Sequence, residues 1–357
     1  MSDITHTGEH QALVVGATGI IGSAILHRLG AAEGWTAIGL SRSRRVAEGR
    51  ARMLEVDLLD PQDCARKLGA LNRITHIFYA AYQARPSRAE EVAPNVQMLR
   101  NVVDAVSGRA RGLKKIVLIT GAKFYGIQWG RVKTPMKETD ARQLPPNFYY
   151  DQEDFLRDAQ RQADWHWCNL IPPFVSGYSV GNPMNLVMAI GVFASLSREL
   201  NLPLRFPGLP GAWSALQQIA DAEQIAAAAH WAATSPAANN EAFNVTNGDP
   251  IRWENFWPAV AGHFGMRLEA PKTLPLGRLM ADNEAAWARM VERYRLQAAS
   301  IAKLVDWNWA DYMFRMEYDV LMETGKIRRA GFQDCVDTTE RFLARFRQLQ
   351  QQQIIPR

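Results

Sequence analysis

The 357-residue sequence predicts an α/β protein with a doubly wound parallel sheet and a smaller, mostly helical C-terminal region. Up to about residue 170, short apolar runs alternate with stretches of helical periodicity. This alternation indicates parallel strands joined by right-handed helical crossovers. The runs are apolar throughout, as expected of strands buried on both faces. A glycine-rich turn between the first run and the first helix indicates a sheet of the Rossmann type.

Six apolar runs and four helical stretches make up this first part of the chain. Pro61 opens one of the helices, and Asp60 before it is a suitable cap for the free amide groups of the first turn. The expected strands cover residues 12–15, 35–40, 53–56, 76–81, 115–119 and 165–171. The expected helices cover residues 16–29, 61–71, 92–106 and 148–163.

The pattern changes after Pro172, where proline, glycine and aromatic residues become frequent. The apolar stretch 186–196 is far shorter than the roughly 20 residues of a membrane span and indicates a buried helix. A helix over 221–233 and a strand over 242–246 follow, and the chain from 251 on is helical and rich in tryptophan, with no further strand expected. We therefore expect a nucleotide-binding domain over 1–170 with a return of 214–250 to the sheet, and a substrate-binding region over 171–213 and 251–357.

The composition excludes several classes of protein. Hydrophobic residues make up 47% and charged residues 22% of the chain, as in globular proteins and unlike disordered or fibrous chains. The net charge is +5 and the basic residues are mostly scattered, so no nucleic-acid partner is expected. The three cysteines and seven histidines form no disulfide frame or metal-ligand pattern, and the polar start of the chain has no signal peptide. We expect a cytoplasmic protein with no metal and no membrane partner.

The segment after the first expected strand reads Gly-Ala-Thr-Gly-Ile-Ile-Gly. Glycine permits a tight turn and lets a pyrophosphate approach the backbone, while the following helix offers free amide groups at its N-terminus. Because strand, turn and helix come in the required order, we interpret the loop as a dinucleotide site rather than as helix packing. Its expected cofactor contacts are Gly16, Thr18, Gly19, Ile20, Ile21 and Gly22.

The residues after the second expected strand indicate which dinucleotide binds. An NAD site carries an acidic residue there, which binds the ribose 2′-hydroxyl. This chain has Arg42 between Ser41 and Ser43, and a guanidinium suits the 2′-phosphate of NADP(H). The alternative is a solvated basic loop. Asp57, followed by Leu58, is interpreted either as a contact of the adenine amino group or as a turn cap.

Two further segments carry reactive side chains. Lys123 comes just past the fifth expected strand, at the sheet end where open α/β sheets bind ligands. Tyr149 and Tyr150 begin the next helix, on which short-chain dehydrogenases usually carry Tyr-x-x-x-Lys. Here Glu153 and Asp154 stand at the lysine position. From residue type alone, Lys123 is either a surface residue or a residue of the site. For Tyr149, residue type alone favours an aromatic side chain that packs in the protein with its hydroxyl bonded.

The displaced lysine occurs together with an Asn-Phe-Tyr-Tyr segment that begins at Asn147. Motifs of the same kind lie at 75–79, 120–123, 152–154, 204–208, 211–213, 240–244 and 247–249. With these motifs, which extend over nearly the whole chain, the sequence resembles the progesterone 5β-reductase and iridoid synthase-like (PRISE) family of atypical extended short-chain dehydrogenase/reductases.

The resemblance implies NADPH-dependent reduction of an activated C=C bond, with hydride added at the β-carbon of an enone or enal. It makes Tyr149 and Lys123 the catalytic residues, with Tyr150 as the alternative if the register is off by one. A phenol O–H stabilises the enolate oxygen as it forms, and we expect a nearby ammonium to lower the pKa of the phenol. Further cofactor contacts that it implies are Ala80, Ala81, Tyr82, Thr120, Gly121, Tyr149, Pro172, Phe174 and Val175. The substrate contacts that it implies are Lys123, Trp129, Tyr149, Met184 and Asn185.

The chain also departs from the family pattern. Ser43 stands where plant members often carry a second arginine, and Ile171 replaces an arginine. The interval from Lys123 to Tyr149 is shorter than in plant members. This segment lines the substrate pocket in the family, so the resemblance implies least about the identity of the substrate. A small apolar enone or enal is expected, with a homodimer as an open alternative to a monomer. Two other kinds of function stay open. The first is another enzyme activity: a dehydrogenase that acts on a carbonyl or alcohol, or a sugar-nucleotide epimerase or dehydratase. The second is a non-catalytic protein that senses NADP.

Overall fold

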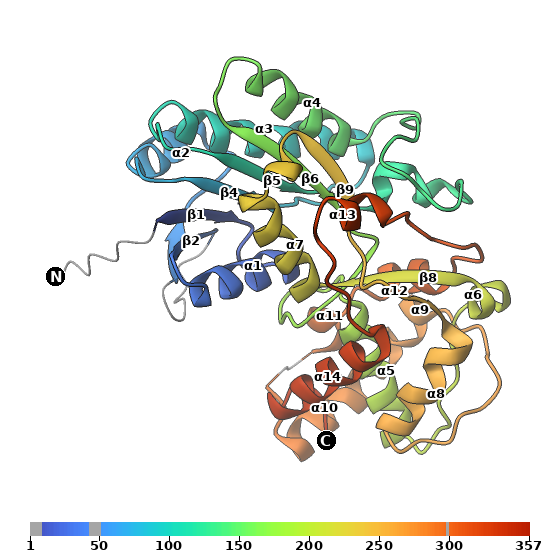
Figure 1. Ribbon diagram of the computed structural model, residues 1–357. Helices are drawn as coiled ribbons and strands as arrows, with labels where there is room; N and C mark the ends of the chain where they lie inside the picture. Colours follow the sequence, from blue (N-terminus) through green and yellow to red (C-terminus); the bar gives the residue numbers. More distant parts are fainter. Residues whose placement is uncertain (1–8, 43–50, 298–299) are drawn as a thin grey trace.

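The computed structural model describes residues 9–42, 51–297 and 300–357, and Figure 1 shows a sheet with helices on both faces above a second, helical lobe. The main sheet has seven strands in the order β3-β2-β1-β4-β5-β6-β9, and all neighbouring pairs are parallel. The predicted α/β fold of the Rossmann type is therefore confirmed. Its strands are β1 (His10–Val15), β2 (Trp35–Ser41), β3 (Ala51–Glu55), β4 (His76–Tyr79), β5 (Lys115–Ile119), β6 (His166–Ile171) and β9 (Glu241–Asn244).

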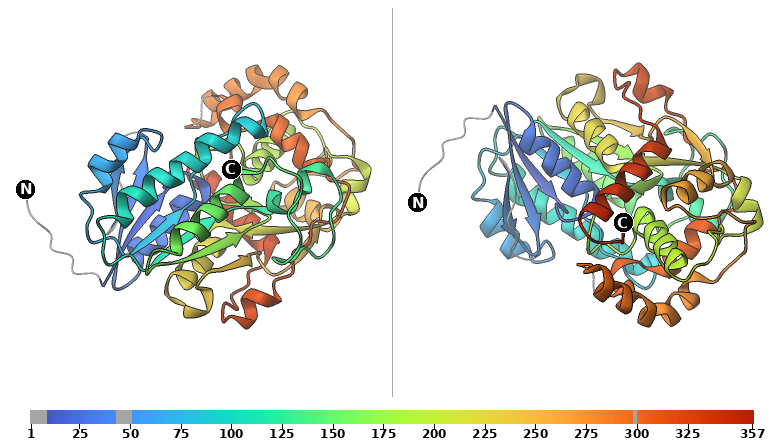
Figure 2. Two further views of the ribbon diagram at one scale, coloured as in Figure 1. Left: turned by 90° about the horizontal axis from the view of Figure 1, so that it is seen from above. Right: turned by 90° about the horizontal axis from the view of Figure 1, so that it is seen from below.

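Helices cover both faces of this sheet, and alternate residues of each strand serve the two faces. In β1, Ala12 and Val14 pack in the layer of α1 and α7, whereas Leu13 and Val15 pack under α2, α3 and α4. All four side chains are fully buried, which explains why the run is apolar at every position. Figure 2 (left) shows α3 and α4 side by side over the sheet. These helices are α1 (Ile20–Ala31), α2 (Pro61–Leu68), α3 (Arg88–Ser107), α4 (Phe148–Gln160) and α7 (Ala222–Thr234).

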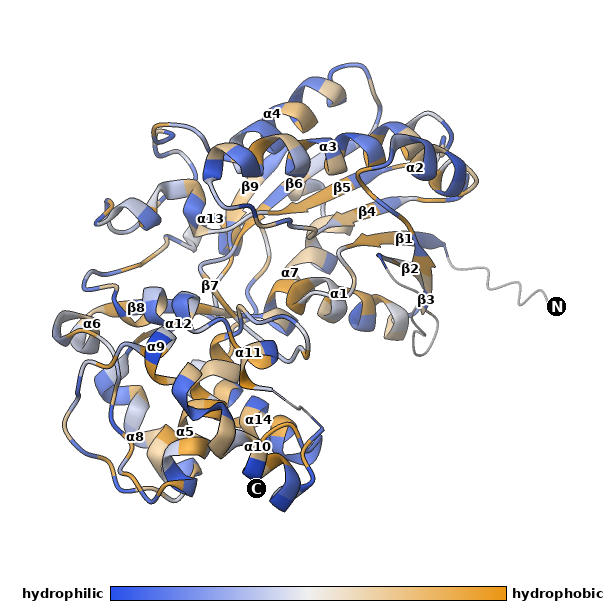
Figure 3. Ribbon diagram, turned by 180° about the vertical axis from the view of Figure 1, so that it is seen from behind, coloured by the Kyte–Doolittle hydropathy of each residue, from blue (hydrophilic) through white to orange (hydrophobic). Residues whose placement is uncertain are grey.

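The second lobe is built around α5, the helix predicted from the apolar stretch after Pro172. Every residue from Leu186 to Ser197 is buried. Trp253, Trp257 and Trp287 fill the same core with less than 2% of their surface exposed. The helices of this lobe are α5 (Leu186–Glu199), α6 (Pro210–Ser214), α8 (Trp253–His263), α9 (Leu276–Leu279), α10 (Glu284–Tyr294), α11 (Ile301–Leu304), α12 (Trp307–Phe314) and α14 (Thr338–Gln351). Figure 3 shows α5 and the strands of the main sheet largely in the colours of hydrophobic residues.

Three short strands form a second sheet, in the order β10-β8-β7. β7 (Phe174–Ser176) and β8 (Leu216–Asp221) are parallel, and β10 (Pro250–Arg252) is antiparallel to β8. Only part of the segment 214–250 returns to the main sheet as expected, because β9 pairs with β6 whereas β8 belongs to the second sheet. The expectation of no strand from residue 251 on is corrected by β10. Strands of three residues carry too little alternation for the pattern to reveal them.

Local signals in the sequence explain where several helices begin. Asp60 caps α2 as expected, since its Oδ1 accepts a hydrogen bond from the amide of Gln62 at 2.9 Å. Asp221, which was expected inside a helix, is instead the cap of α7 and accepts from the amide of Glu223. Within the described part of the chain, no helix has the length and apolar character needed to cross a bilayer.

Candidate active site

The candidate site is a cleft of about 400 Å³ at the carboxyl ends of β1, β2 and β4. The strand order reverses between β1 and β4, and ligands of open α/β sheets bind at such a switch point. The cleft brings together half of the expected cofactor contacts and one expected substrate contact. These are Gly16, Thr18, Gly19, Ser41, Arg42, Asp57, Leu58, Ala80, Ala81, Tyr82 and Met184. Ile20, Ile21 and Gly22 lie in the first turn of α1, and Ser43 is outside the described residues.

The glycines of the first turn are required by the close approach of backbone segments. Gly16 has a φ of +82°, and a Cβ there would lie 2.8 Å from the carbonyl of Ala80 and from the amide nitrogen of Ala81. A Cβ on Gly22 would lie 2.1 Å from the carbonyl oxygen of Gly16. α1 begins after Gly19 with no acidic residue in its first turn and no side-chain cap. The turn therefore presents backbone amides and a positive helix end to the cleft, which suits a pyrophosphate.

Arg42 and Asp57 lie at the opposite wall of the cleft. Arg42 directly follows β2 and lines the cleft, as the sequence predicts for a contact of a 2′-phosphate. The Asp57 carboxylate accepts a hydrogen bond from the amide of Leu59 at 3.0 Å, so it caps a turn while also lining the cleft. Both interpretations of Asp57 are compatible with this position.

Tyr149 lies at the other end of the site, where β5 and β6 end. A Cβ placed on Gly121 would lie 3.4 Å from the Tyr149 hydroxyl and 3.7 Å from the carbonyl oxygen of Pro172. Among the residues that the structure describes, this hydroxyl has no hydrogen-bond partner. Burial raises the pKa of Tyr149 to about 12, and the charge of Glu91 adds to this rise, while Arg88 opposes it. The phenol is therefore a proton donor at neutral pH, and the cation that lowers its pKa is Arg88, where we expected Lys123.

Tyr150 has a different task, although it is the next residue in α4. Its ring is buried, and its hydroxyl donates to the carbonyl of Phe124 and accepts from the amide of Gln143 at 3.0 Å. The guanidinium of Arg142 lies 4.9 Å from the centre of the ring. Tyr150 thus fastens the segment between β5 and α4. Of these two tyrosines, Tyr149 is the one whose hydroxyl stays free for a ligand.

Lys123 is bonded through its main chain to Asn147, the cap of α4. It lies in the 3-10 helix η1 (Ala122–Tyr125), and its carbonyl accepts from the Asn147 side chain at 2.9 Å. The other amide atom of Asn147 accepts from the backbone of Tyr149 at 3.2 Å. One side chain therefore connects both expected catalytic residues. Burial lowers the pKa of Lys123, Arg88 lowers it further and Glu91 opposes, and the ammonium has no hydrogen-bond acceptor within the described ranges.

Glu153 occupies the place of the missing helix lysine, and its side chain is buried. It accepts from the Asn169 amide at 2.7 Å, and Asn169 in turn accepts from the Thr120 hydroxyl at 2.8 Å. Arg157 compensates the charge of Glu153 at 2.9 Å. The carboxylate therefore joins α4 to β6 and to the end of β5, and Glu153 is not among the residues that line the cleft.

The structure adds three residues of α3 that the sequence did not indicate, and the charges of two of them, Arg88 and Glu91, act on Lys123. Glu91 in the first turn of α3 is buried and accepts a hydrogen bond from the Tyr82 hydroxyl. Arg88 lies 3.9 Å from the other oxygen of Glu91. Asn95, one turn further along α3, hydrogen-bonds both the amide and the carbonyl of Gln83 at 2.8 and 2.9 Å and so folds this segment back onto the helix. An acidic residue in a first helical turn normally indicates only a favourable helix dipole, so no sequence signal identified Glu91.

The remaining expected contacts lie in several places. Phe174 and Val175 belong to β7, directly after Pro172 at the end of β6. Trp129 is exposed at the rim, where the guanidinium of Arg88 lies 5.3 Å from its ring. Asn185 caps α5, accepting from the amide of Met188 and donating to the carbonyl of Gly177, so its amide is committed to the fold and the structure does not favour the expected substrate contact.

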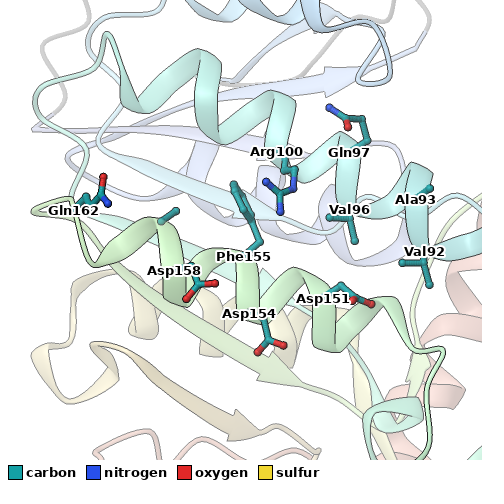
Figure 4. A pocket seen from close by; sticks show the side chains of 11 residues that line it. Val92, Ala93, Val96, Gln97, Arg100, Asp151, Asp154, Phe155, Asp158 and Gln162 are labelled. Atoms are coloured by element: carbon teal, nitrogen blue, oxygen red, sulfur yellow. The ribbon is translucent and has the colours of Figure 1, made fainter.

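A second hollow, of about 740 Å³, lies between α3 and α4 on the outer face of the sheet (Figure 4). The guanidinium of Arg100 lies 4.5 Å from the ring of Phe155, and Asp151, Asp154 and Asp158 line the α4 side. Because it shares no residue with the glycine turn or with Tyr149, it is not part of the candidate site.

Comparison with known proteins identifies the family. The model of the PRISE-like Rossmann-fold domain matches residues 56–356. The chain belongs to this family. Among its PRISE relatives, the (S)-8-oxocitronellyl enol synthase of Nepeta racemosa is 34% identical over 87% of this chain and 84% of its own length. The 3-oxo-Δ(4,5)-steroid 5β-reductase of Arabidopsis thaliana is 32% identical over 91% of this chain and 87% of its own length. Family and relatives identify this PRISE protein as an oxidoreductase.

Solved structures of lower identity share the fold of this PRISE chain. The UDP-glucose 4-epimerase of Thermotoga maritima, solved with UDP-glucose, covers 95% of this chain and 99% of its own with a TM-score of 0.66 and 17% identity. The UDP-glucose 4-epimerase of Thermus thermophilus, solved with NAD, covers 94% and 99% with a TM-score of 0.66 and 18% identity. At these identities the likeness concerns the fold alone.

Proposed function

We propose that this PRISE enzyme is an NADPH-dependent reductase of activated C=C bonds, which adds hydride at the β-carbon of α,β-unsaturated ketones or aldehydes. The observation that carries this proposal is that Tyr149 and Lys123, whose phenol and ammonium have no hydrogen-bond partner among the described residues, are joined through their main chains by the Asn147 side chain near the carboxyl ends of β5 and β6. The names of the relatives, a steroid 5β-reductase and an enol synthase, support the same chemistry.

Three observations support NADP(H) as the cofactor. The glycine turn leads into α1, whose first turn has no acidic residue and no side-chain cap, so its free backbone amides suit a pyrophosphate. Arg42 has the charge and geometry for a 2′-phosphate. Solved proteins of the same fold carry NAD, which supports a nicotinamide cofactor here. When bound, the cofactor supplies the hydride.

Tyr149 and Lys123 then serve the oxygen of the substrate. Hydride addition at a β-carbon builds negative charge on the carbonyl oxygen, and the Tyr149 hydroxyl donates a hydrogen bond to it as the enolate forms. The pKa of about 12 keeps this phenol protonated, so it acts as a donor. The Lys123 ammonium adds a positive field in a partly buried place, where a charge acts more strongly than in water.

The same features disfavour carbonyl reduction and sugar-nucleotide epimerisation or dehydration. Those reactions remove or deliver a proton through a tyrosine whose pKa an adjacent lysine lowers. Here Glu153 stands at the lysine position and the pKa of Tyr149 is raised. A non-catalytic NADP sensor would have no need of an unpaired phenol and ammonium next to the cofactor cleft.

The test is turnover with a panel of simple enones and a stereospecifically deuterated NADPH. We expect NADPH oxidation and a saturated carbonyl product with deuterium at the β-carbon. An allylic alcohol labelled at the carbinol carbon would show that the enzyme reduces the carbonyl. No oxidation with any enone, together with tight NADPH binding, would favour the sensor.

The proposal also covers the substrate class, the partners and the location of the enzyme. We infer a small apolar enone or enal as substrate, no nucleic-acid partner, a cytoplasmic location and a homodimer. Scattered basic residues and a net charge of only +5 support the absence of a nucleic-acid partner. Light scattering after size-exclusion chromatography measures the oligomeric state, and a monomer would contradict the last point.

A further inference from the structure

Glu91 is a buried acid with no role in the mechanism above. It is 6% exposed and lies in the first turn of α3, whose other acidic residue, Glu90, is exposed and bonded to Ser87 at 2.7 Å. Burying a carboxylate costs free energy unless hydrogen bonds or opposite charges compensate it. Its partners therefore indicate why it is there.

Those partners lead directly to the proposed catalytic residues. One oxygen of Glu91 accepts from the Tyr82 hydroxyl, and the other lies 3.9 Å from Arg88. The ring of Tyr82 stacks on Phe148 with centroids 5.6 Å apart and planes inclined by 16°. The Lys123 ammonium lies 5.9 Å from the centre of the Tyr82 ring.

Phe148 completes the connection. Its ring lies 4.4 Å from the ring of Tyr149, so one face of the Tyr82–Phe148 stack supports the phenol and the Tyr82 ring faces the ammonium. A cation over an aromatic ring is attracted without being bonded to an acceptor. Lys123 is thereby held in place while its three N–H groups stay available.

We propose that Glu91 and Tyr82 form a positioning pair, in which Glu91 fixes the Tyr82 ring as the platform for the Lys123 ammonium and for the Phe148–Tyr149 stack. This inference rests on the proposed function of Tyr149 and Lys123. Neither Glu91 nor the Tyr82 hydroxyl touches the reacting atoms in it.

The charges around Lys123 give Glu91 a second effect. The charges of Arg88 and Glu91 act on Lys123 from α3, and the Tyr82 ring faces its ammonium from the segment after β4. Burial and Arg88 both lower the pKa of Lys123, and Glu91 is the charge that raises it. Replacing Glu91 by glutamine leaves an oxygen to accept from Tyr82 but removes this compensation, so Lys123 loses its proton at lower pH.

The experiment compares Glu91→Gln with Glu90→Gln, an equal loss of charge one residue away. The lysine Cε signals of the ¹³C-labelled enzyme are titrated by NMR, with Lys123→Met assigning the signal, and the pH dependence of kcat with an enone is measured. We expect the titration of Lys123 and the alkaline limb of kcat to move to lower pH in Glu91→Gln alone. NADPH affinity and the melting temperature of Glu91→Gln should stay close to those of Glu90→Gln.

Substitutions of Tyr82 test the role of its ring separately from the charge of Glu91. Tyr82→Phe keeps the ring but loses the hydroxyl that Glu91 binds, so kcat should fall moderately, whereas Tyr82→Leu removes the platform and should lower kcat by up to about a hundredfold, as misplaced catalytic groups do. Equal rates for the two variants would overturn the platform. An unchanged Lys123 titration in Glu91→Gln, or an equal shift in Glu90→Gln, would overturn the role of Glu91. The NMR titration needs no substrate, so this result stands apart from a failure of the enone chemistry.

Discussion

The two ends of the candidate site are built in different ways. At the glycine turn the contacts come from backbone, and Gly16 and Gly22 are there because any Cβ would collide with neighbouring main chain. At the Tyr149 end the groups are side chains that come from α3, α4, η1 and the segment after β4. A backbone site leaves a contiguous motif in the sequence, while a side-chain site assembled from four segments does not. Breaking each end should therefore have different consequences.

The largest effect is expected at the backbone end. In Gly22→Ala the new Cβ would meet the Gly16 carbonyl oxygen at 2.1 Å, and neither atom can move without shifting the turn. We expect destabilisation by roughly 1–3 kcal/mol, as for other overpacked sites, and loss of measurable NADPH binding. Thermal unfolding and fluorescence titration check this. Gly112→Ala, which meets open space, is the control and should change neither; full NADPH affinity in Gly22→Ala would contradict the tight turn.

At the side-chain end, Tyr149→Phe removes a hydrogen-bond donor and little else. We expect kcat to fall by roughly a hundredfold to a thousandfold, as for loss of an oxyanion donor, with NADPH affinity unchanged. Tyr150→Phe should do the opposite, because its hydroxyl fastens the segment before α4. It should lower the melting temperature and largely keep kcat. An inactive Tyr150→Phe beside an active Tyr149→Phe would reverse the two assignments.

Arg42 is the basic side chain expected to bind the cofactor at the backbone end. Losing a bidentate contact to a phosphate costs about 1.5–3 kcal/mol, so Arg42→Ala should weaken NADPH binding by roughly tenfold to a hundredfold and leave NADH binding unchanged. Arg52→Ala, an exposed arginine on β3, is the matched control. If the unaltered enzyme binds both cofactors equally well, the preference for NADPH is refuted.

The smallest effect concerns pH. Because the pKa of Lys123 is lowered, its ammonium loses its proton at a pH below that of an ordinary lysine. The pKa of Tyr149 is raised, so its ionisation comes later. We expect kcat to fall on the alkaline side as Lys123 deprotonates. In Lys123→Met, kcat should be lower but the alkaline limb should be absent; its persistence would assign the limb to another group.

The same contrast explains what could be predicted from the sequence. The main sheet was predictable because each buried strand leaves an apolar run, and the glycine turn because it is contiguous. β7 and β10, with three residues each, leave no such pattern. The choice between Tyr149 and Tyr150 depends on which hydroxyl the loop between β5 and α4 uses, and Glu91 meets Tyr82 only because Asn95 folds the intervening segment back. Such tertiary contacts are not encoded in local spacing.

The path of the chain between the lobes has a consequence for modularity. β9 pairs with the edge of β6, and α7 covers the same face of the sheet as α1, yet both follow the chain's excursion through α5 and α6. A fragment ending at residue 170 would expose the unpaired edge of β6 and the apolar side of α1, a combination that promotes aggregation. The nucleotide-binding half therefore cannot be moved to another protein as one continuous segment. Engineering or recombination that exchanges one lobe must exchange several separate segments of the chain together.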